Sequence, residues 1–319
     1  MTINLQPLTL HDRAQIEGAI SAIPALQSSP LSMLAFAPHY LWRHQFRFFW
    51  STTNGWVVLF AEYADGIYAP LPPLGPVPTD GSSGSLAPYE EILGIVFDFM
   101  KERNRGMAVS RIENIPEELK DEFQAAGYRL QPKDSDYLYR TEDLVHLKGD
   151  RYKSQRAAYN QFIRSKTPSF QPYSSSDRNA CLALFDRWSS QKKKAVSTGR
   201  GTDTWLKQAM LEDARSAHEE VLMHAEELGL LGRVVRVGES VCGYTFGYVR
   251  TPQVFCVLVE VADRTITGLA QYLFREIGRE CLSYAFINTM DDSGLSSLAR
   301  SKALYRPCQL VPNYIATMG

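Results

Sequence analysis

Apolar positions along the chain follow two periods, one typical of strands and one typical of helices. Strand-like alternation or short apolar runs occupy residues 46–50, 56–63, 230–237, 241–250 and 254–261. Two turn sequences between them, Thr53-Asn54-Gly55 and Gly238-Glu239-Ser240, predict hairpins. Helical spacing recurs over residues 88–104, 150–166, 177–189, 204–228 and 268–281.

The predicted elements follow the same order in each half of the chain. Each half has helices, an antiparallel meander, a helix, a strand, a second helix and a last strand. This order predicts an α+β layer architecture and not the βαβ alternation of a dinucleotide-binding fold, whose GxGxxG sequence is missing. We therefore expect two domains, residues 1–147 and 148–319, which agrees with ordinary domain sizes.

Three segments carry weaker or opposing signals. Residues 70–85, PLPPLGPVPTDGSSGS, are too rich in Pro, Gly and Ser for regular structure. The basic, glycine-containing stretch 191–202 predicts a loop. Residues 128–130 and 137–139 predict two short strands.

Charge and composition exclude several classes of protein. The chain has 34 Lys and Arg against 35 Asp and Glu, so a globally basic nucleic-acid binder is not expected. Six basic residues and one acidic residue nevertheless occur between residues 147 and 170. No apolar run is long enough to span a bilayer, and the N-terminus lacks the pattern of a secretory signal, so we expect a cytoplasmic protein. The spacing of Cys and His predicts no metal site.

Six phrases resemble, in this order, one bacterial family. They are LSMLAFAPHYLWR, GIYAPLPPLGP, LKGDRYKSQRAAYNQF, CLALFDRW, GRVVRVGESVCGYTFGY and FINTMDDSGLSSLARSKALYRP. The family is grouped with the C-terminal domain of phosphatidylglycerol lysyltransferase. Its most specific sequence covers residues 288–307, where Ser297 and Ala299 replace a usual Gly and Arg.

The resemblance implies both a fold and a class of activity. It implies two fused GNAT-like units, each a mixed, mostly antiparallel sheet flanked by helices, with the site in the second unit and none in the first. The lysyltransferases move an aminoacyl group from aminoacyl-tRNA to a lipid head group, and Fem-type transferases share the architecture. We therefore expect transfer of an activated aminoacyl or acyl group to an amine or hydroxyl.

Two other functions stay open at this point. One is an acyl-CoA-dependent N-acyltransferase, and the other is a non-catalytic module that binds an amino-acid-like ligand. The co-substrate is accordingly aminoacyl-tRNA or acyl-CoA, and no cofactor is certain. The basic stretch that begins at residue 147 would suit tRNA, a CoA phosphate or anionic lipid head groups at a membrane surface, although a solvated helix face explains most such charges.

Three residues are candidates for catalysis. Glu260 interrupts an otherwise apolar strand, and burial there would raise its pKa toward that of a general base. Asp291 follows the next strand, where a carboxylate can accept a proton or hold a substrate ammonium. Lys302 could stabilise a developing oxyanion. Helix capping and a surface ion-pair network are the structural alternatives.

A second set of residues is expected to bind substrate. It comprises Asn288, Tyr305, Arg306, Arg156, Trp188 and Tyr244, although aromatic residues at these spacings also fit a core. We expect the three catalytic candidates, Asn288 and Tyr305 to converge on one pocket of the second unit, near Arg156.

Gly268 and Ala270 stand where an acyl-CoA enzyme would bind the pyrophosphate on bare helix amides. Thr265 replaces the Gln or Arg that usually opens this sequence. We therefore expect weak or absent acetyl-CoA binding, and a plain helix start is the alternative for Gly268.

Overall fold

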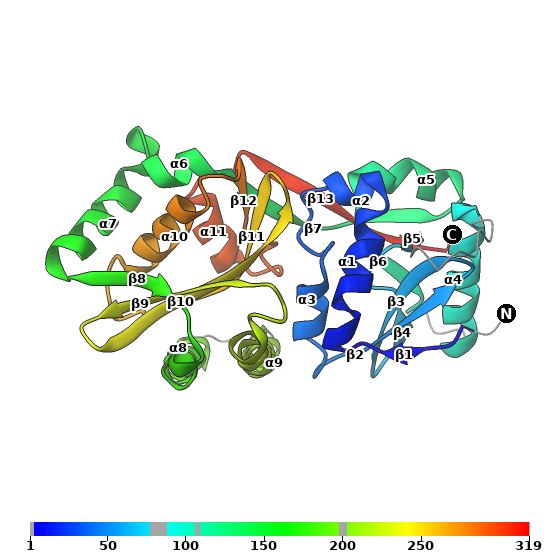
Figure 1. Cartoon of the computed structure of the whole chain (residues 1–319), viewed down its shortest axis with the longest axis horizontal. Helices are drawn as coiled ribbons and strands as arrows, with labels where there is room; N and C mark the ends of the chain where they lie inside the picture. The colour runs from blue at the N-terminus through cyan, green and yellow to red at the C-terminus, as the bar shows by residue number, and fades with distance from the viewer. Residues whose placement is uncertain (1–2, 77–87, 106–108, 198–202, 319) are drawn as a thin grey trace. The chain divides into compact units, whose positions relative to one another are not determined.

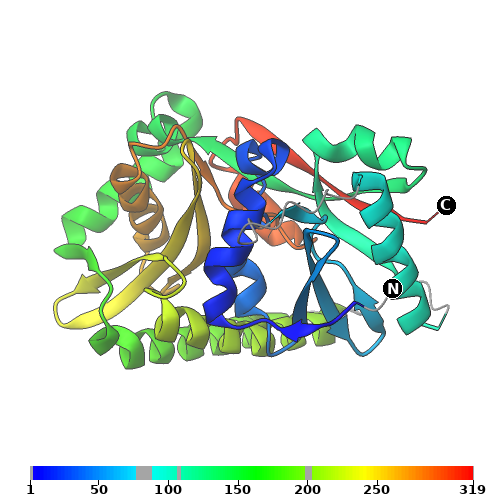
Figure 2. The same ribbon diagram turned by 45° about the vertical axis from the view of Figure 1, so that its right-hand side comes forward.

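The computed structural model describes residues 3–76, 88–105, 109–197 and 203–318. Contacts within the chain divide it into two compact units. The first unit contains residues 1–136, 291–294 and 310–319, and the second contains residues 137–290 and 295–309. Figures 1 and 2 show the elements of both units. The domain boundary expected near residue 148 remains a prediction.

The first unit begins with an antiparallel meander. Its strands are β1 (Gln6–Pro7), β2 (Arg47–Thr53), β3 (Trp56–Tyr63) and β4 (Gly66–Tyr68), in that order across the sheet, and β5 (Leu74–Pro76) pairs with β3. Asn54 and Gly55 both have positive φ, 49° and 82°, as the predicted β2–β3 hairpin turn requires. The helices of this part are η1 (Leu10–Asp12), α1 (Arg13–Ser21), α2 (Pro24–Ser28), α3 (Phe36–Leu41) and α4 (Tyr89–Arg103).

A second group of elements completes this unit. It consists of β6 (Arg111–Pro116), η2 (Glu117–Leu119), α5 (Lys120–Ala125), the first part of β7 (Arg129–Arg140) and β13 (Gln309–Thr317). Strand β13 pairs with β6 in antiparallel register, with Tyr314 opposite Ile115. The last strand of the chain therefore belongs to the first unit.

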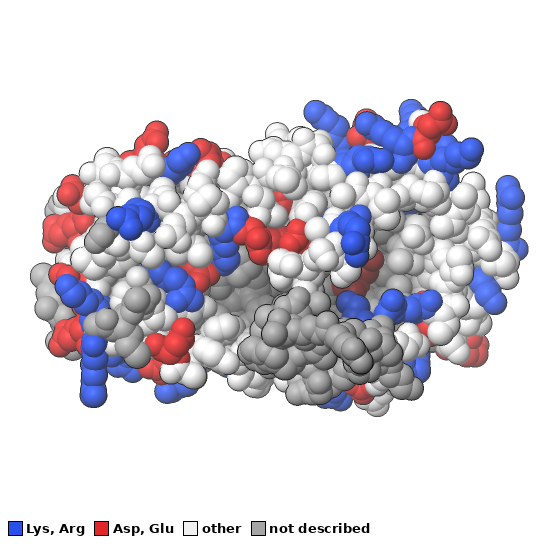
Figure 3. All heavy atoms as spheres, turned by 180° about the vertical axis from the view of Figure 1, so that it is seen from behind, with Lys and Arg blue, Asp and Glu red and all other residues white. Residues whose placement is uncertain are grey.

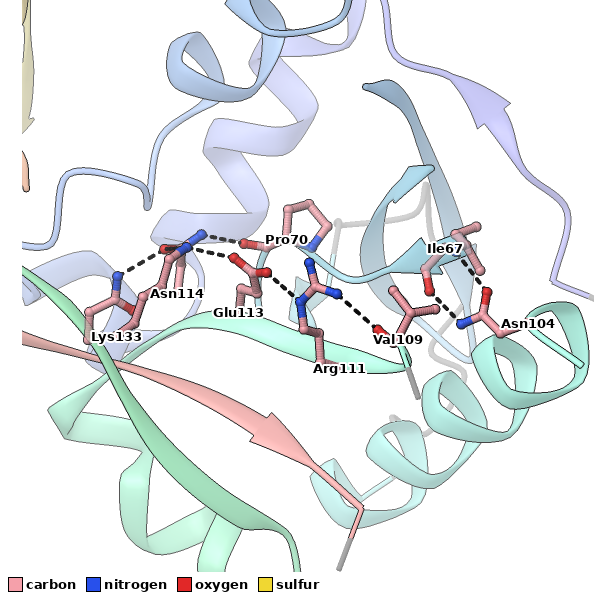
Figure 4. A network of polar contacts seen from close by, with 9 residues as sticks. Ile67, Pro70, Asn104, Val109, Arg111, Glu113, Asn114 and Lys133 are labelled. Carbon is pink, nitrogen blue, oxygen red and sulfur yellow. Dashed lines mark hydrogen bonds and ion pairs between the residues drawn. The ribbon is translucent and has the colours of Figure 1, made fainter. Parts of the chain in front are cut away.

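A buried polar network fixes β6 (Figure 4). Glu113 accepts hydrogen bonds from Arg111 Nε and Lys133 Nζ, both at 2.6 Å. Asn114 has a left-handed φ of 55°, donates to Pro70 O at 2.8 Å and accepts from Lys133 at 3.1 Å. Burial opposes ionisation of Glu113, but the charges and hydrogen bonds of Lys133 and Arg111 outweigh it and lower the pKa of Glu113.

The second unit has a layered α+β structure. Its sheet has the order β7, β12 (Phe286–Asn288), β11 (Val254–Ala262), β10 (Ser240–Thr251), β9 (Leu231–Val237) and β8 (Pro168–Pro172). Its helices are α6 (Thr141–His146), η3 (Asp150–Tyr152), α7 (Lys153–Ser165), η4 (Ser175–Asp177), α8 (Arg178–Ser197), α9 (Asp203–His224), α10 (Leu269–Glu280) and α11 (Ser296–Ala303). Helices α7 and α10 cover one face of the sheet, and α8 and α9 cover the other (Figures 1 and 2).

Strands β11 and β12 separate after a short parallel contact. Only Val254, Phe255 and Cys256 of β11 pair with β12, opposite Phe286, Ile287 and Asn288. The register of β10 and β11 also shifts between Phe246 and Gly247, which indicates a bulge at this point. The remainder of β11, which includes Glu260, therefore runs beyond its paired stretch with β12.

The expected α+β class, with mixed and mostly antiparallel sheets, is confirmed. The expected element order holds except for β8, a strand between α7 and α8 that the pattern did not predict. The loop expected over residues 191–202 is wrong up to Ser197, because α8 continues through a stretch without Gly or Pro. Residues 198–202 lie outside the described residues.

Two further expectations about strands need correction. The pair of strands at 128–130 and 137–139 is one strand, β7, which includes Pro132 and pairs with β12 only over residues 138–140. Within the Pro-rich segment, Leu74–Pro76 forms β5, and residues 77–87 lie outside the described residues.

Candidate functional site

Glu260 is a half-buried residue of β11, and one oxygen of its carboxylate is buried without a partner. Its Oε2 atom makes no hydrogen bond with any residue that the structure describes. Burial raises the pKa of Glu260 to about 8. On the neighbouring strand Thr245 stands opposite Glu260, and Tyr244 stands opposite Val261. Successive strand residues face opposite sides of a sheet, so Glu260 and Tyr244 point to different faces.

Tyr305 follows α11 and is a neighbour of Glu260. Its ring packs edge-on against Phe274 of α10, with ring centroids 4.7 Å apart. Burial raises the pKa of Tyr305, and the charge of Glu260 raises it further. The Tyr305 hydroxyl makes no hydrogen bond within the described chain. Its phenol therefore stays protonated at neutral pH and can donate a hydrogen bond to a ligand.

The backbone around Tyr305 is held by side chains from other elements. Tyr152 donates its hydroxyl to the carbonyl of Tyr305 at 3.2 Å, and Gln155 donates to the carbonyl of Leu304 at 3.1 Å. Tyr139 donates to the carbonyl of Lys302 at 3.0 Å. Residues 139, 152 and 155 were not predicted to contribute to the site, because nothing in an isolated Tyr or Gln signals a bond to a distant carbonyl.

Lys302 and Asn288 hold the turn that follows β12. The Lys302 ammonium donates to the carbonyls of Thr289 and Met290, the second at 3.0 Å, and lies 5.4 Å from the centre of the Tyr137 ring. The buried Asn288 accepts a hydrogen bond from the Met290 amide at 2.6 Å, where Met290 has a left-handed φ of 63°. The side chains of Lys302 and Asn288 therefore bind the same turn of the second unit, residues 289–290.

Asp291 and Arg306 lie on turns. The Asp291 carboxylate accepts from the amide and hydroxyl of Ser293, at 2.8 and 3.3 Å, and Asp292 accepts from the Gly294 amide at 3.0 Å. These are consecutive Asx turns, and residues 291–294 belong to the first unit by their contacts. Arg306 is exposed and has a left-handed φ of 55°. The catalytic role of Asp291 and its convergence with Glu260 remain predictions.

Arg156, Trp188 and Tyr244 make packing or backbone contacts. Arg156 donates to the carbonyls of Leu147 and Gly149, the second at 2.7 Å. Trp188 lies between Phe185, with ring centroids 5.6 Å apart, and the ammonium of Lys192, 4.0 Å from its ring. Tyr244 is fully buried, and its hydroxyl is 2.9 Å from Nδ1 of His218 on α9. A substrate role for these three residues stays a prediction.

Gly268 has a structural explanation. It precedes α10 with a φ of 84°, and a Cβ atom there would lie 2.2 Å from the carbonyl oxygen of Ala158 and 2.9 Å from Cβ of Phe162. The glycine therefore permits α7 to lie directly against the start of α10. Ala270 is exposed on the first turn of the helix. Pyrophosphate binding at these two positions stays a prediction.

The surface of the second unit has a hollow on helix α7. Its volume is about 460 Å³, and it is lined by Ala157, Asn160, Gln161, Arg164 and Ser165.

In the part of the chain that the structure describes, no three His, Cys, Asp or Glu side chains are grouped so that they could hold a metal ion. Within that part, none of the helices has both the length and the apolar composition needed to cross a membrane.

The fold places the chain in a class of proteins built from two α+β units. A comparison with protein families identifies the family within this class. Residues 28–317 match the family described as phosphatidylglycerol lysyltransferase, C-terminal. The chain belongs to this family, which confirms the resemblance seen in the sequence. A search of curated proteins finds no match.

Solved structures with the same fold cover nearly the whole chain. A conserved protein of unknown function from Bacteroides thetaiotaomicron is 20% identical, with a TM-score of 0.82 and complete coverage of both chains. The C-terminal domain of a putative lysylphosphatidylglycerol synthetase from Agrobacterium fabrum is 13% identical, with a TM-score of 0.60 over 96% of this chain and 92% of that one. L-PGS from Bacillus licheniformis is 16% identical, with a TM-score of 0.59 over 99% and 93%.

Proposed function

We propose that this protein transfers an aminoacyl group from aminoacyl-tRNA to an amine or hydroxyl acceptor, with its chemistry at Glu260 and Tyr305. Membership of the lysyltransferase family supports the class of reaction. The observation that carries the proposal is the buried Glu260 carboxylate, whose Oε2 has no hydrogen-bond partner in the described chain, beside a protonated phenol. A buried acid of this kind costs stability, and such a cost is typical of functional sites.

The two side chains supply complementary parts of an acyl transfer. The Glu260 carboxylate takes the proton from the acceptor as its nitrogen or oxygen attacks the ester carbonyl carbon of the aminoacyl group. A pKa of about 8 makes Glu260 a stronger base than an ordinary carboxylate. The Tyr305 hydroxyl donates a hydrogen bond to the carbonyl oxygen, which carries negative charge in the tetrahedral intermediate. The ester C–O bond then breaks, and the leaving hydroxyl of the tRNA takes up the proton.

The remaining candidates have supporting roles in this proposal. Lys302 and Asn288 fix the turn after β12, and Tyr139 fixes the backbone of Lys302. We assign Lys302 and Asn288 to positioning, because their polar groups bind backbone atoms. Asp291 is tested separately as the carboxylate that would hold the ammonium group of an amino-acid-like substrate.

A transfer assay tests the proposal. The protein is incubated with radiolabelled aminoacyl-tRNAs and with phosphatidylglycerol vesicles or a soluble amine, and acceptor-bound label is measured. Glu260→Gln should lower kcat by about 10²- to 10⁴-fold, the usual contribution of a general base. Glu239→Gln, an exposed carboxylate in the β9–β10 turn, is the matched control and should leave kcat unchanged.

Two results would overturn the proposal. Full activity of Glu260→Gln would remove Glu260 from the chemistry. Turnover with acyl-CoA thioesters but with none of the aminoacyl-tRNAs would establish the N-acyltransferase instead. Asp291→Asn, run in the same assay, should raise KM for the amino-acid-like substrate if its carboxylate holds the ammonium group.

A further inference from the structure

Two guanidinium groups of α10 lie against one tyrosine of α7, and a third guanidinium lies near them. Arg275 and Arg279 lie with their Cζ atoms 4.3 and 5.5 Å from the centre of the Tyr159 ring. Arg279 donates to the Tyr159 hydroxyl at 2.9 Å and to Glu276 at 2.7 Å, and Tyr159 donates to Glu276 at 2.8 Å. Arg156 is near enough for its charge to act on Arg275.

The group carries more positive charge than its own acid can balance. Burial lowers the pKa of Arg275, and the neighbouring charges of Arg279 and Arg156 lower it further. Glu276 is the acid that contacts this group, and it bonds to Arg279 and Tyr159. Three guanidinium groups around one carboxylate leave an excess of positive charge, which favours binding of an anion.

Arg275 has hydrogen-bond donors to spare. Its Nε atom donates to the carbonyl of Val145 at 2.7 Å, which fixes the plane of the guanidinium. Its two terminal nitrogens make no hydrogen bond within the described chain. A fixed guanidinium with free terminal N–H groups matches the geometry of phosphate oxygens.

The positive surface continues along α7. Lys148, Lys153, Arg164 and Lys166 are exposed and make no ion pair with the residues that the structure describes. Arg164 also lines the hollow along α7, together with the amides of Asn160 and Gln161. Figure 3 shows Lys and Arg side chains gathered over the α6–α7 part of the second unit. Arg156 and Arg164 are eight residues apart, or about 12 Å along the helix axis.

We propose that this α7–α10 surface binds the phosphodiester backbone of RNA. It is formed by Arg156, Arg164, Arg275, Arg279 and the exposed lysines in or next to α7, which are Lys148, Lys153 and Lys166. The inference deepens the proposed function, on which it rests, by assigning the donor a docking surface. RNA fits better than a membrane, because Ile163 is the large apolar side chain that α7 exposes, at 40%. Amide groups between the cations suit phosphates and sugars, whereas membrane insertion calls for aromatic and aliphatic residues.

Binding of a fluorescein-labelled RNA hairpin with a single-stranded CCA end tests the surface directly. Anisotropy is measured with the full chain at about 50 and 200 mM salt, because each phosphate contact adds close to one unit to the salt slope. Arg164→Gln and Arg275→Gln should each weaken binding several-fold and lower the slope of log Kd against log salt by about one. Arg164 has no hydrogen bond to lose within the described chain, so its variant should fold normally.

Two control variants test whether the position of the charge and the geometry of the guanidinium matter for RNA binding. Lys101→Gln removes an exposed cation from α4 of the first unit and should leave Kd unchanged. Arg275→Lys keeps the positive charge but loses the planar, two-pronged set of N–H donors of the guanidinium. Its RNA affinity should therefore lie between that of Arg275→Gln and that of the wild type. Unchanged RNA affinity in both Gln variants would overturn the inference.

The experiment also distinguishes this inference from the proposed function. The hairpin carries no amino acid, so its binding does not depend on transfer. Salt-sensitive RNA binding that is lost in both Gln variants supports the surface even if the transfer assay fails. If both variants instead lose binding to vesicles containing phosphatidylglycerol while RNA binding is unchanged, the surface is a membrane contact and the inference is wrong.

Discussion

The Tyr305 phenol lies within the electrostatic field of the Glu260 carboxylate, and burial and this charge raise the pKa of Tyr305 together. The two groups come from segments 45 residues apart in the sequence. One is a strand beyond its pairing with β12, and the other is a turn that Tyr152 and Gln155 hold by its carbonyls. A strong base and a hydrogen-bond donor near each other are what a direct acyl transfer through a tetrahedral intermediate uses.

The stability of the protein should depend on Glu260 at alkaline pH. Its pKa is about 8 in the folded state and 4.5 ordinarily, so the folded state binds more protons between these values. Folding stability should therefore fall as pH rises from 4.5 through 8. Glu260→Gln, which cannot ionise, should lose this part of the pH dependence and be more stable than the wild type at pH 9. Urea unfolding of both proteins at pH 5 and pH 9 measures the effect, and identical pH dependence would contradict it.

Replacing Gly268 should be costly because of α7. Gly268→Ala forces a non-glycine residue to φ 84° and drives its Cβ into the carbonyl of Ala158. Gly149 has the same φ of 84° but nothing within 4 Å of its Cβ position. We expect Gly149→Ala to cost about 1 kcal/mol, the conformational term alone. Gly268→Ala should cost about 2–4 kcal/mol because overpacking is added. Equal losses in chemical denaturation would show that α7 does not restrict this position.

Tyr244 and Tyr305 should behave in opposite ways when each loses its hydroxyl. Tyr244→Phe leaves the buried His218 without its partner and should cost about 1–2 kcal/mol of stability, with no effect on kcat. Tyr305→Phe removes a hydroxyl that bonds nothing in the described chain, so stability should change little while kcat falls. Thermal unfolding and the transfer assay together measure both. Loss of turnover in Tyr244→Phe with intact stability would instead favour the substrate role expected from the sequence.

Glu113 should stabilise the first unit at neutral pH. Glu113→Gln leaves Lys133 and Arg111 without their shared carboxylate, whose side chain is only 12% exposed, and should cost about 2–3 kcal/mol. The pKa of Glu113 is lowered by folding, so its contribution is present above pH 4.5 and is lost as pH falls through the folded pKa. The difference between wild type and variant should accordingly shrink in acid. If the free energies of unfolding of wild type and Glu113→Gln differ by the same amount at pH 7 and at pH 3, the ion pairs do not stabilise the protein.

Local patterns predicted the elements well, because alternation and helical spacing are properties of neighbouring residues. The strand from Trp56 to Tyr63 has the predicted bounds. Glu260 was also identifiable, because a carboxylate in an apolar strand is a visible exception. The continuity of β7 was missed because it depends on pairing with two distant strands, β13 on one side and β12 on the other, which both lie over 140 residues away in the sequence.

Other parts of the site could not be predicted for the same reason. In the sequence, Gly268 resembles an anion-binding glycine. Its contact with Ala158 depends on how α7 packs against α10, which the local sequence does not show. Arg275 and Arg279 were not singled out, because their excess charge arises only when α10 lies against Tyr159 of α7.

The pairing of β13 with β6 has a consequence for synthesis on the ribosome. The first unit takes up residues 310–319, so its sheet cannot be finished when residue 136 leaves the exit tunnel. The nascent first unit must wait, with β6 lacking this neighbour, while the whole second unit is translated. Domains usually fold one after another as they emerge, but here the first to be made is among the last to be completed.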